Sequence, residues 1–168
     1  MTVLARRTAG SLVAALLLGA SLAACGSSAP RPTTSTMSVS SATAAIRTAF
    51  TTLFNLSNPS VAVKLAVVQD GAQLRQAITA ELKSPLAKLA GGASLQSVKI
   101  EHGTACRNAD LTSPCAAVTY SILSTSQTPL LRNSKGFALY VGSRWLVSKT
   151  TICTLLTLAN GNVPPKGC

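Results

Sequence analysis

Apolar residues recur at helical spacing through the segment that begins at residue 42. Residues 42–55 predict an amphipathic helix, because one face would carry Ala45, Ile46, Ala49, Phe50, Leu53 and Phe54. After the sequence SNPS, Pro59 is expected to start a second helix, with an apolar stripe at Val61, Leu65 and Val68. The sequence QDGAQ separates it from a third helix, for which Asp70 is the expected cap. That helix has its apolar stripe at Leu74, Ile78 and Leu82, and Pro85 interrupts it.

The apolar period changes to two after the sequence AGGAS, which is itself expected to be a turn. Val98, Ile100 and His102 would share one face of a strand, with Lys99 and Glu101 on the other. A second strand alternates at Val118, Tyr120 and Ile122. The sequence RNSKG is expected to turn into the strand FALYV, and GSR is expected to turn tightly into WLVS. Thr150 or Thr151 would cap a last helix that stops at Asn160-Gly161.

Helices followed by a meander of strands predict an α+β fold, with helices packed on one face of a curved antiparallel sheet. This order resembles the cone-shaped fold of the nuclear transport factor two superfamily. That resemblance implies an N-terminal helical layer over a bent sheet, often with a pocket between the two layers.

The first 24 residues have the pattern of a secretory signal peptide, with Arg6 and Arg7 before a short apolar stretch. That stretch is shorter than the ~20 residues that a spanning helix needs. Leu22-Ala23-Ala24-Cys25 resembles the bacterial lipobox, which implies that Cys25 is acylated and becomes the new N-terminus of a lipoprotein. The alternative is an ordinary secretory cleavage site beside an unrelated cysteine.

Residues 25–41 are expected to form a Ser/Thr/Pro-rich tether, and residues 42–168 a single domain. The chain has 15 basic and 4 acidic residues, so removal of Arg6 and Arg7 leaves 13 against 4, a net charge of +9. Because the basic residues are scattered along an exported chain, we expect no nucleic-acid partner. An anionic membrane or envelope polymer is the expected partner, beside the bilayer that acylated Cys25 would enter. The alternative is that the charge only keeps the domain soluble.

Four cysteines remain once Cys25 is assigned to lipid, and an even number in an exported protein predicts disulfides. Three connectivities are possible. We expect Cys106–Cys115, around the polar stretch RNADLTSP, and Cys153–Cys168, which would fold the tail back on the last helix. A zinc site is the disfavoured alternative, because the chain has a single histidine and no C-x-x-C motif. No metal or cofactor is expected.

Few side chains suit catalysis. The acidic residues are interpreted as a helix cap at Asp70, a solvated residue on a helix at Glu81, a strand residue at Glu101 and a turn residue at Asp110. His102 is the single histidine, and alternation directs its ring inward beside Val98 and Ile100. It is either a hydrogen-bonded core residue or, with Tyr120, a polar contact in a ligand pocket. Trp145 is expected in the core, with an exposed binding surface as the alternative.

Residues 42–158 resemble the C-terminal domain of the mycobacterial low-molecular-weight secreted antigen family. The matching segments are AIRTAFTTLFN, VVQDGAQL, AAVTYSIL and GFALYVGSRWLVSKTTICTLLTL. The resemblance implies an exported or surface-held domain of the cone-shaped fold and transfers no catalytic residue.

These features together predict a lipoprotein on the extracytoplasmic face of the cell membrane, whose domain binds a partner or an apolar ligand without catalysis. One alternative is a structural or antigenic surface protein without a ligand. The other, less favoured, is an enzyme that uses His102 in a buried cavity.

Overall fold

The computed structural model describes residues 37–168 except residue 108. The predicted signal peptide, Cys25 and the tether up to residue 36 lie outside the described residues. In the described part of the chain no helix combines the length and the apolar character needed to cross a bilayer.

Helix α1 (Val39–Phe54) confirms the first predicted helix, but it starts three residues before the expected domain boundary at residue 42. Its N-cap is Ser38, whose hydroxyl accepts a hydrogen bond from the Ser41 amide at 3.1 Å. The preceding Met37 also belongs to the folded part, because its sulfur accepts the Trp145 indole N–H at 3.3 Å. The apolar face of α1 packs on the sheet through Ala42, Ile46, Ala49, Phe50 and Leu53.

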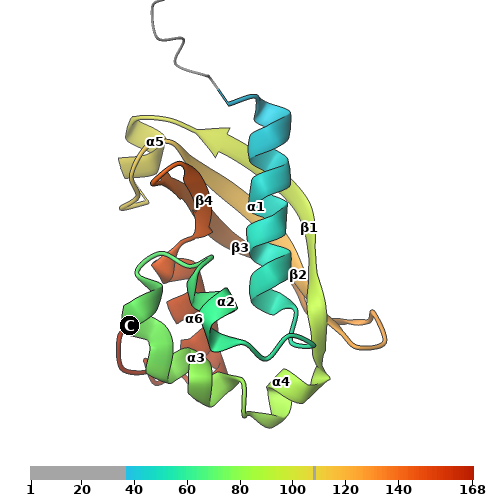
Figure 1. Ribbon diagram of the computed structural model, residues 1–168. Coiled ribbons are helices and arrows are strands. Elements are labelled where there is room, and N and C mark those ends of the chain that lie inside the picture. Colours follow the sequence, from blue (N-terminus) through green and yellow to red (C-terminus); the bar gives the residue numbers. More distant parts are fainter. Residues whose placement is uncertain (1–36, 108) are drawn as a thin grey trace, which may run out of the picture. The chain divides into compact units, whose positions relative to one another are not determined.

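The chain after α1 forms short helices that gather near the C-terminal end of α1 in Figure 1, namely α2 (Val61–Leu65), η1 (Gly71–Leu74), α3 (Arg75–Glu81) and α4 (Pro85–Leu89). Pro59 does not open α2, because the N-cap is Ser60, whose hydroxyl faces the Val63 amide. Asp70 stands at the N-cap position of η1 but makes no capping bond with its side chain. Its φ is 51°, so it reverses the chain in the left-handed region, which Asp tolerates better than most residues.

Four antiparallel strands form a curled sheet in the order β1-β2-β3-β4, namely β1 (Ala90–Glu101), β2 (Cys115–Ser124), β3 (Pro129–Val141) and β4 (Arg144–Val147). The AGGAS segment is the beginning of β1 and not a turn. The register shifts there, and a Cβ on Gly91 would lie 2.7 Å from the Ser124 carbonyl oxygen. Gly91 therefore allows a bulge with close backbone approach, and in the sequence such a glycine pair resembles a turn.

The segment RNSKG is not the expected turn. It lies within β3, which begins at Pro129, well before the apolar segment FALYV. The polar side chains of this segment belong to the more exposed half of β3, which pairs with β2. The tight turn between β3 and β4 is confirmed, with Gly142 and Ser143 at φ 55° and 64°. Positive φ at both central residues suits the right-handed twist of a two-residue hairpin.

Helix α6 (Lys149–Ala159) closes the domain beside β3 and α3. Ser148 caps it in place of the expected Thr150 or Thr151, since the buried Ser148 hydroxyl accepts the Thr151 amide at 3.1 Å. The Thr151 hydroxyl instead accepts the Phe137 amide at 2.7 Å and so joins the helix to the sheet. Asn160 ends the helix as predicted.

The core lies between α1, the concave face of the sheet and α6. An aromatic cluster joins its layers, because Tyr120 of β2 lies 5.2 Å from Phe50 and 5.7 Å from Phe54 between ring centroids. Trp145 is buried, as expected, with its ring 5.5 Å from Tyr140. Helices covering one face of a curved antiparallel sheet confirm the predicted α+β fold.

Both expected disulfides are present. Cys106–Cys115 joins α5 (Thr104–Arg107) to the first residue of β2, with a Cα–Cα distance of 5.7 Å. Cys153–Cys168 ties the C-terminal tail to α6, with a Cα–Cα distance of 5.4 Å. Cys106 and Cys115 form a small buried cluster with Leu111, separate from the main core.

Candidate functional site: an apolar pocket

An apolar pocket of about 300 Å³ lies where α3, α4 and α6 meet the C-terminal end of α1 and the sheet. Cavities that hold small ligands begin at about this volume. Sixteen of its eighteen lining residues carry hydrocarbon side chains, and the two exceptions are Lys64 and Glu81.

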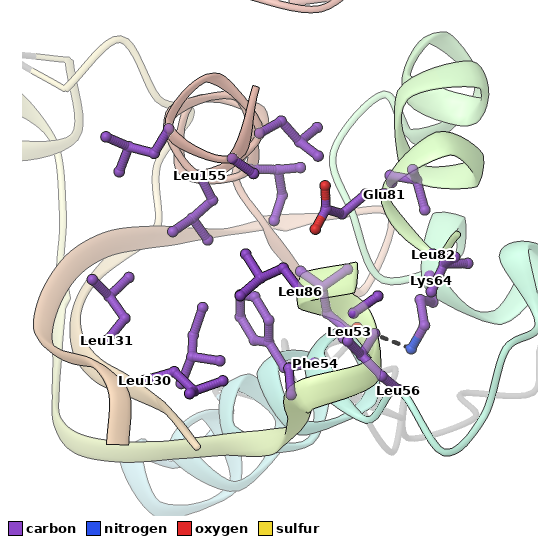
Figure 2. Close-up of a pocket in the computed structure, with 18 residues that line it drawn as sticks. Leu53, Phe54, Leu56, Lys64, Glu81, Leu82, Leu86, Leu130, Leu131 and Leu155 are labelled. Carbon is purple, nitrogen blue, oxygen red and sulfur yellow. Dashed lines mark hydrogen bonds between the residues drawn. The ribbon is translucent and has the colours of Figure 1, made fainter. Parts of the chain in front are cut away.

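Several elements contribute apolar side chains to the lining of the pocket. Helix α6 has apolar residues on more than one face, and five of them line the pocket: Ile152, Leu155, Leu156, Leu158 and Ala159. The end of α1 contributes Leu53 and Phe54. Across the cavity, Leu130 and Leu131 project from β3, and Leu131 pairs in register with Ile122 of β2 (Figure 2).

The mouth of the pocket has an apolar rim. Leu86 of α4, Leu130 of β3 and Leu158 of α6 are 46%, 41% and 57% exposed, and all three line the pocket. Single exposed leucines are ordinary on protein surfaces, but a group of them around a cavity marks an interaction site. The rim gives an apolar molecule a path from the surface into the pocket.

Lys64 of α2 is 1% exposed, and its ammonium group donates to three backbone carbonyls at the C-terminal end of α1. The acceptors are Thr52 at 3.1 Å, Leu53 at 2.9 Å and Asn55 at 2.8 Å. Carbonyls in the last turn of a helix have no partner within the helix, and the helix dipole makes that end negative. Lys64 thus caps α1, and burial lowers the pKa of its ammonium group below the ordinary value.

Glu81 stands at the end of α3 and is half-buried, with its carboxylate directed into the cavity in Figure 2. Its Oε1 accepts a hydrogen bond from the Ser84 hydroxyl at 3.0 Å. The Ser84 oxygen in turn accepts the Ala87 amide at 3.1 Å and caps α4. Glu81 thus lies on a helix as expected, but it is half-buried at the pocket and not fully solvated.

The residues predicted to form a pocket do not line this one. His102 follows the last residue of β1 and is exposed, so the expectation that its ring points inward was wrong. Because β1 ends at Glu101, the alternation of its side chains does not extend to His102. Val98 and Ile100 are half-buried against the core. Tyr120 is buried in the aromatic cluster, where burial raises its pKa to about 12. Glu101 pairs with Lys99 at 3.0 Å.

The sequence pattern did not assign Lys64, Glu81 or the leucines of the rim to a pocket. One signal was available: Leu56, Leu86, Leu130 and Leu131 lie outside the apolar stripes of the predicted helices and strands. No pattern along the chain shows which of these residues meet in space.

Residues 39–163 match the model of the family described as low molecular weight antigen MTB12, C-terminal domain. No curated protein and no solved structure matched the chain. The matched span extends from the first residue of α1 to beyond the end of α6, so it takes in every helix and strand described above. The chain therefore belongs to the family of the low molecular weight antigen MTB12 C-terminal domain, as its resemblance to the mycobacterial antigens predicts.

Proposed function

We propose that the protein is an envelope lipoprotein, anchored on the extracytoplasmic face of the cell membrane, whose domain binds an apolar ligand without catalysis. Family membership supports the broader statement that it is a secreted or envelope antigen. The ligand-binding part rests on one observation, the open pocket with its hydrocarbon lining and leucine rim. Burying apolar surface yields about 25 cal/mol per Å², so such a pocket favours an apolar chain or ring over water.

The absence of catalysis is proposed because of where the polar groups stand. The pocket's own polar side chains are Lys64, which is engaged with backbone carbonyls, and Glu81. His102, the basis of the enzyme alternative, is exposed and is not among the pocket residues. An activity that disappears in His102→Ala protein would favour the enzyme.

Probe binding tests the ligand proposal. The exported chain carrying Cys25→Ala would be titrated into N-phenyl-1-naphthylamine, an uncharged dye whose fluorescence rises in apolar surroundings. We expect saturable binding that Ala87→Phe abolishes, because Ala87 is a buried lining residue and a ring there fills the cavity. The control is Ala80→Phe, at an exposed position of α3 outside the pocket, which should bind the dye normally.

Absence of saturable dye binding would instead favour the alternative of a structural or antigenic surface protein without a ligand. The family description, which names an antigen, is the observation on that side. Dye binding that survives Ala87→Phe would place the apolar site elsewhere on the domain.

The anchor is tested separately, since Cys25 lies outside the described residues. Cys25→Ala should move the protein from the membrane fraction to the medium, because several acyl chains hold a protein on a bilayer and a chain without them is soluble. A Cys25→Ala protein that stays with the membrane would show that another segment anchors it.

A further inference from the structure

The polar groups of the pocket differ in what they can offer a ligand. An ammonium group has three hydrogen-bond donors and no acceptor. All three donors of Lys64 are used on the carbonyls of Thr52, Leu53 and Asn55, at 2.8 to 3.1 Å. Among the described residues that line the pocket, the one cationic side chain therefore has no donor left for an anionic head group.

Glu81 has acceptor capacity to spare. An ionised carboxylate offers about four lone-pair sites, and the described hydrogen bonds use one of them, on the Ser84 hydroxyl at 3.0 Å. Within residues 37–107 and 109–168, no Lys, Arg or His nitrogen lies within 4.0 Å of this carboxylate. The bond to Ser84 also fixes its direction, since Ser84 is held by the first turn of α4.

We infer that the pocket takes amphiphiles with an apolar chain and a hydrogen-bond donor as head group, ammonium before hydroxyl, and rejects those with a carboxylate or phosphate head. This inference rests on the proposed function and names the ligand class for the same pocket. An ammonium or hydroxyl head would donate to Glu81 while the chain lies among the leucines (Figure 2). An anionic head would face a like charge in partly desolvated surroundings and find no side-chain donor.

This selectivity runs against the charge of the whole domain. The described residues contain 12 Lys and Arg against the 4 acidic residues, so the surface as a whole attracts anions. A preference for cationic amphiphiles can therefore come from a local carboxylate and not from the net charge. Because the net charge and the Glu81 carboxylate favour head groups of opposite charge, the order in which amphiphiles bind shows which of the two controls binding.

The experiment is a competition assay at pH 7.5 with the exported chain carrying Cys25→Ala. Decylamine and decanoate, each below its micelle concentration, and decanol, below its solubility limit, would displace N-phenyl-1-naphthylamine. Decylamine should displace the dye at a concentration about tenfold lower than decanoate, with decanol between them. Glu81→Gln should remove this order, since the amide can still accept from Ser84 but carries no charge.

Glu101→Gln is the matched control, because it makes the same change in charge on β1, beside Lys99 and outside the pocket, and it should leave the order intact. Decanoate that binds as well as decylamine, or an order that survives Glu81→Gln, would overturn the inference. If the dye and decanol do not bind at all, the proposed function itself fails. If they bind without any order, only the head-group inference fails. Should Glu81→Gln not fold, as judged by circular dichroism, the order in the parent protein decides.

Discussion

Lys64 is buried although its side chain is charged, and its environment explains why the fold keeps it. The ammonium group replaces its water with three backbone carbonyls, all from the last turn of α1 and the residue after it. Without it, the Thr52 and Leu53 carbonyls would lose this donor, whereas the Asn55 carbonyl would keep the hydrogen bond that it accepts from the Asn58 amide at 3.2 Å. One side chain thus joins α2 to the end of α1.

Replacing Lys64 by Met should lower the free energy of unfolding by about 3 kcal/mol, because it leaves the buried Leu53 carbonyl and the half-buried Thr52 carbonyl without this donor. Urea denaturation followed by circular dichroism measures the loss. Lys83→Met is the control, at an exposed position after α3, and should change stability by less than about 0.5 kcal/mol. Equal stability of the two variants would show that the carbonyls accept hydrogen bonds from water when Lys64 is absent.

Tyr120 makes the stability of the domain sensitive to alkaline pH. Its pKa is about 12 in the folded protein and about 10 in an unfolded chain, because burial disfavours the phenolate. Above pH 10 the unfolded state therefore holds fewer protons than the folded state, so stability falls as pH rises. The contribution is complete below about pH 10 and should have fallen by about 2 kcal/mol at pH 12.

Comparing the parent protein with Tyr120→Phe by urea denaturation at several alkaline pH values isolates this effect. The lowered pKa of Lys64 makes stability rise with pH, which opposes the effect of Tyr120. Both proteins contain Lys64, so its contribution cancels in the comparison. The phenylalanine variant should lose less stability between pH 10 and 12 than the parent. Parallel curves would mean that Tyr120 does not drive the alkaline loss.

At the level of elements, α6 contributes to both the core and the pocket. Its buried residues complete the core, and its remaining leucines form a wall of the pocket. The helix is held at its start by the Ser148 cap and by Thr151 on β3. Near its middle, Cys153 ties it to the tail through Cys168. The pocket therefore depends on a helix that three separate contacts position.

Cys153→Ala/Cys168→Ala should lower stability by about 3 kcal/mol, since the disulfide spans 15 residues, and should also weaken dye binding by releasing α6. Cys106→Ala/Cys115→Ala is the control, because its 9-residue separation predicts a similar loss of stability on a loop outside the pocket. Fluorescence titration of both folded variants tells them apart. Equal weakening of dye binding in the two would contradict a specific role of α6.

For the whole molecule, the excess of basic residues predicts attraction to anionic surfaces. The exported chain carrying Cys25→Ala should bind vesicles rich in anionic lipid at low salt and leave them near 0.15 M salt, where screening acts within about 8 Å. Vesicle sedimentation at both salt concentrations measures this. Equal binding to neutral vesicles would point instead to insertion of exposed leucines such as Leu86 and Leu89.

The sequence by itself determined the α+β class, the first and last helices, the hairpin turn at Gly142 and the disulfide pairs, because local periodicity and short separations encode each of them. It did not determine where β1 begins, since a bulge at Gly91 looks like a turn along the chain. Nor did it place His102, because a strand that ends one residue earlier breaks the alternation.

The pocket was decided by tertiary structure alone. Its residues come from α1, α2, α3, α4, β1, β2, β3 and α6 and from the segments beside them, and no regular spacing along the chain connects these positions. Burial of Lys64 follows from the carbonyls at the end of α1, twelve to nine residues away, and the direction of Glu81 follows from the turn at Ser84. The chemical group of each side chain can be read from the sequence, but the groups that surround it depend on how distant elements pack.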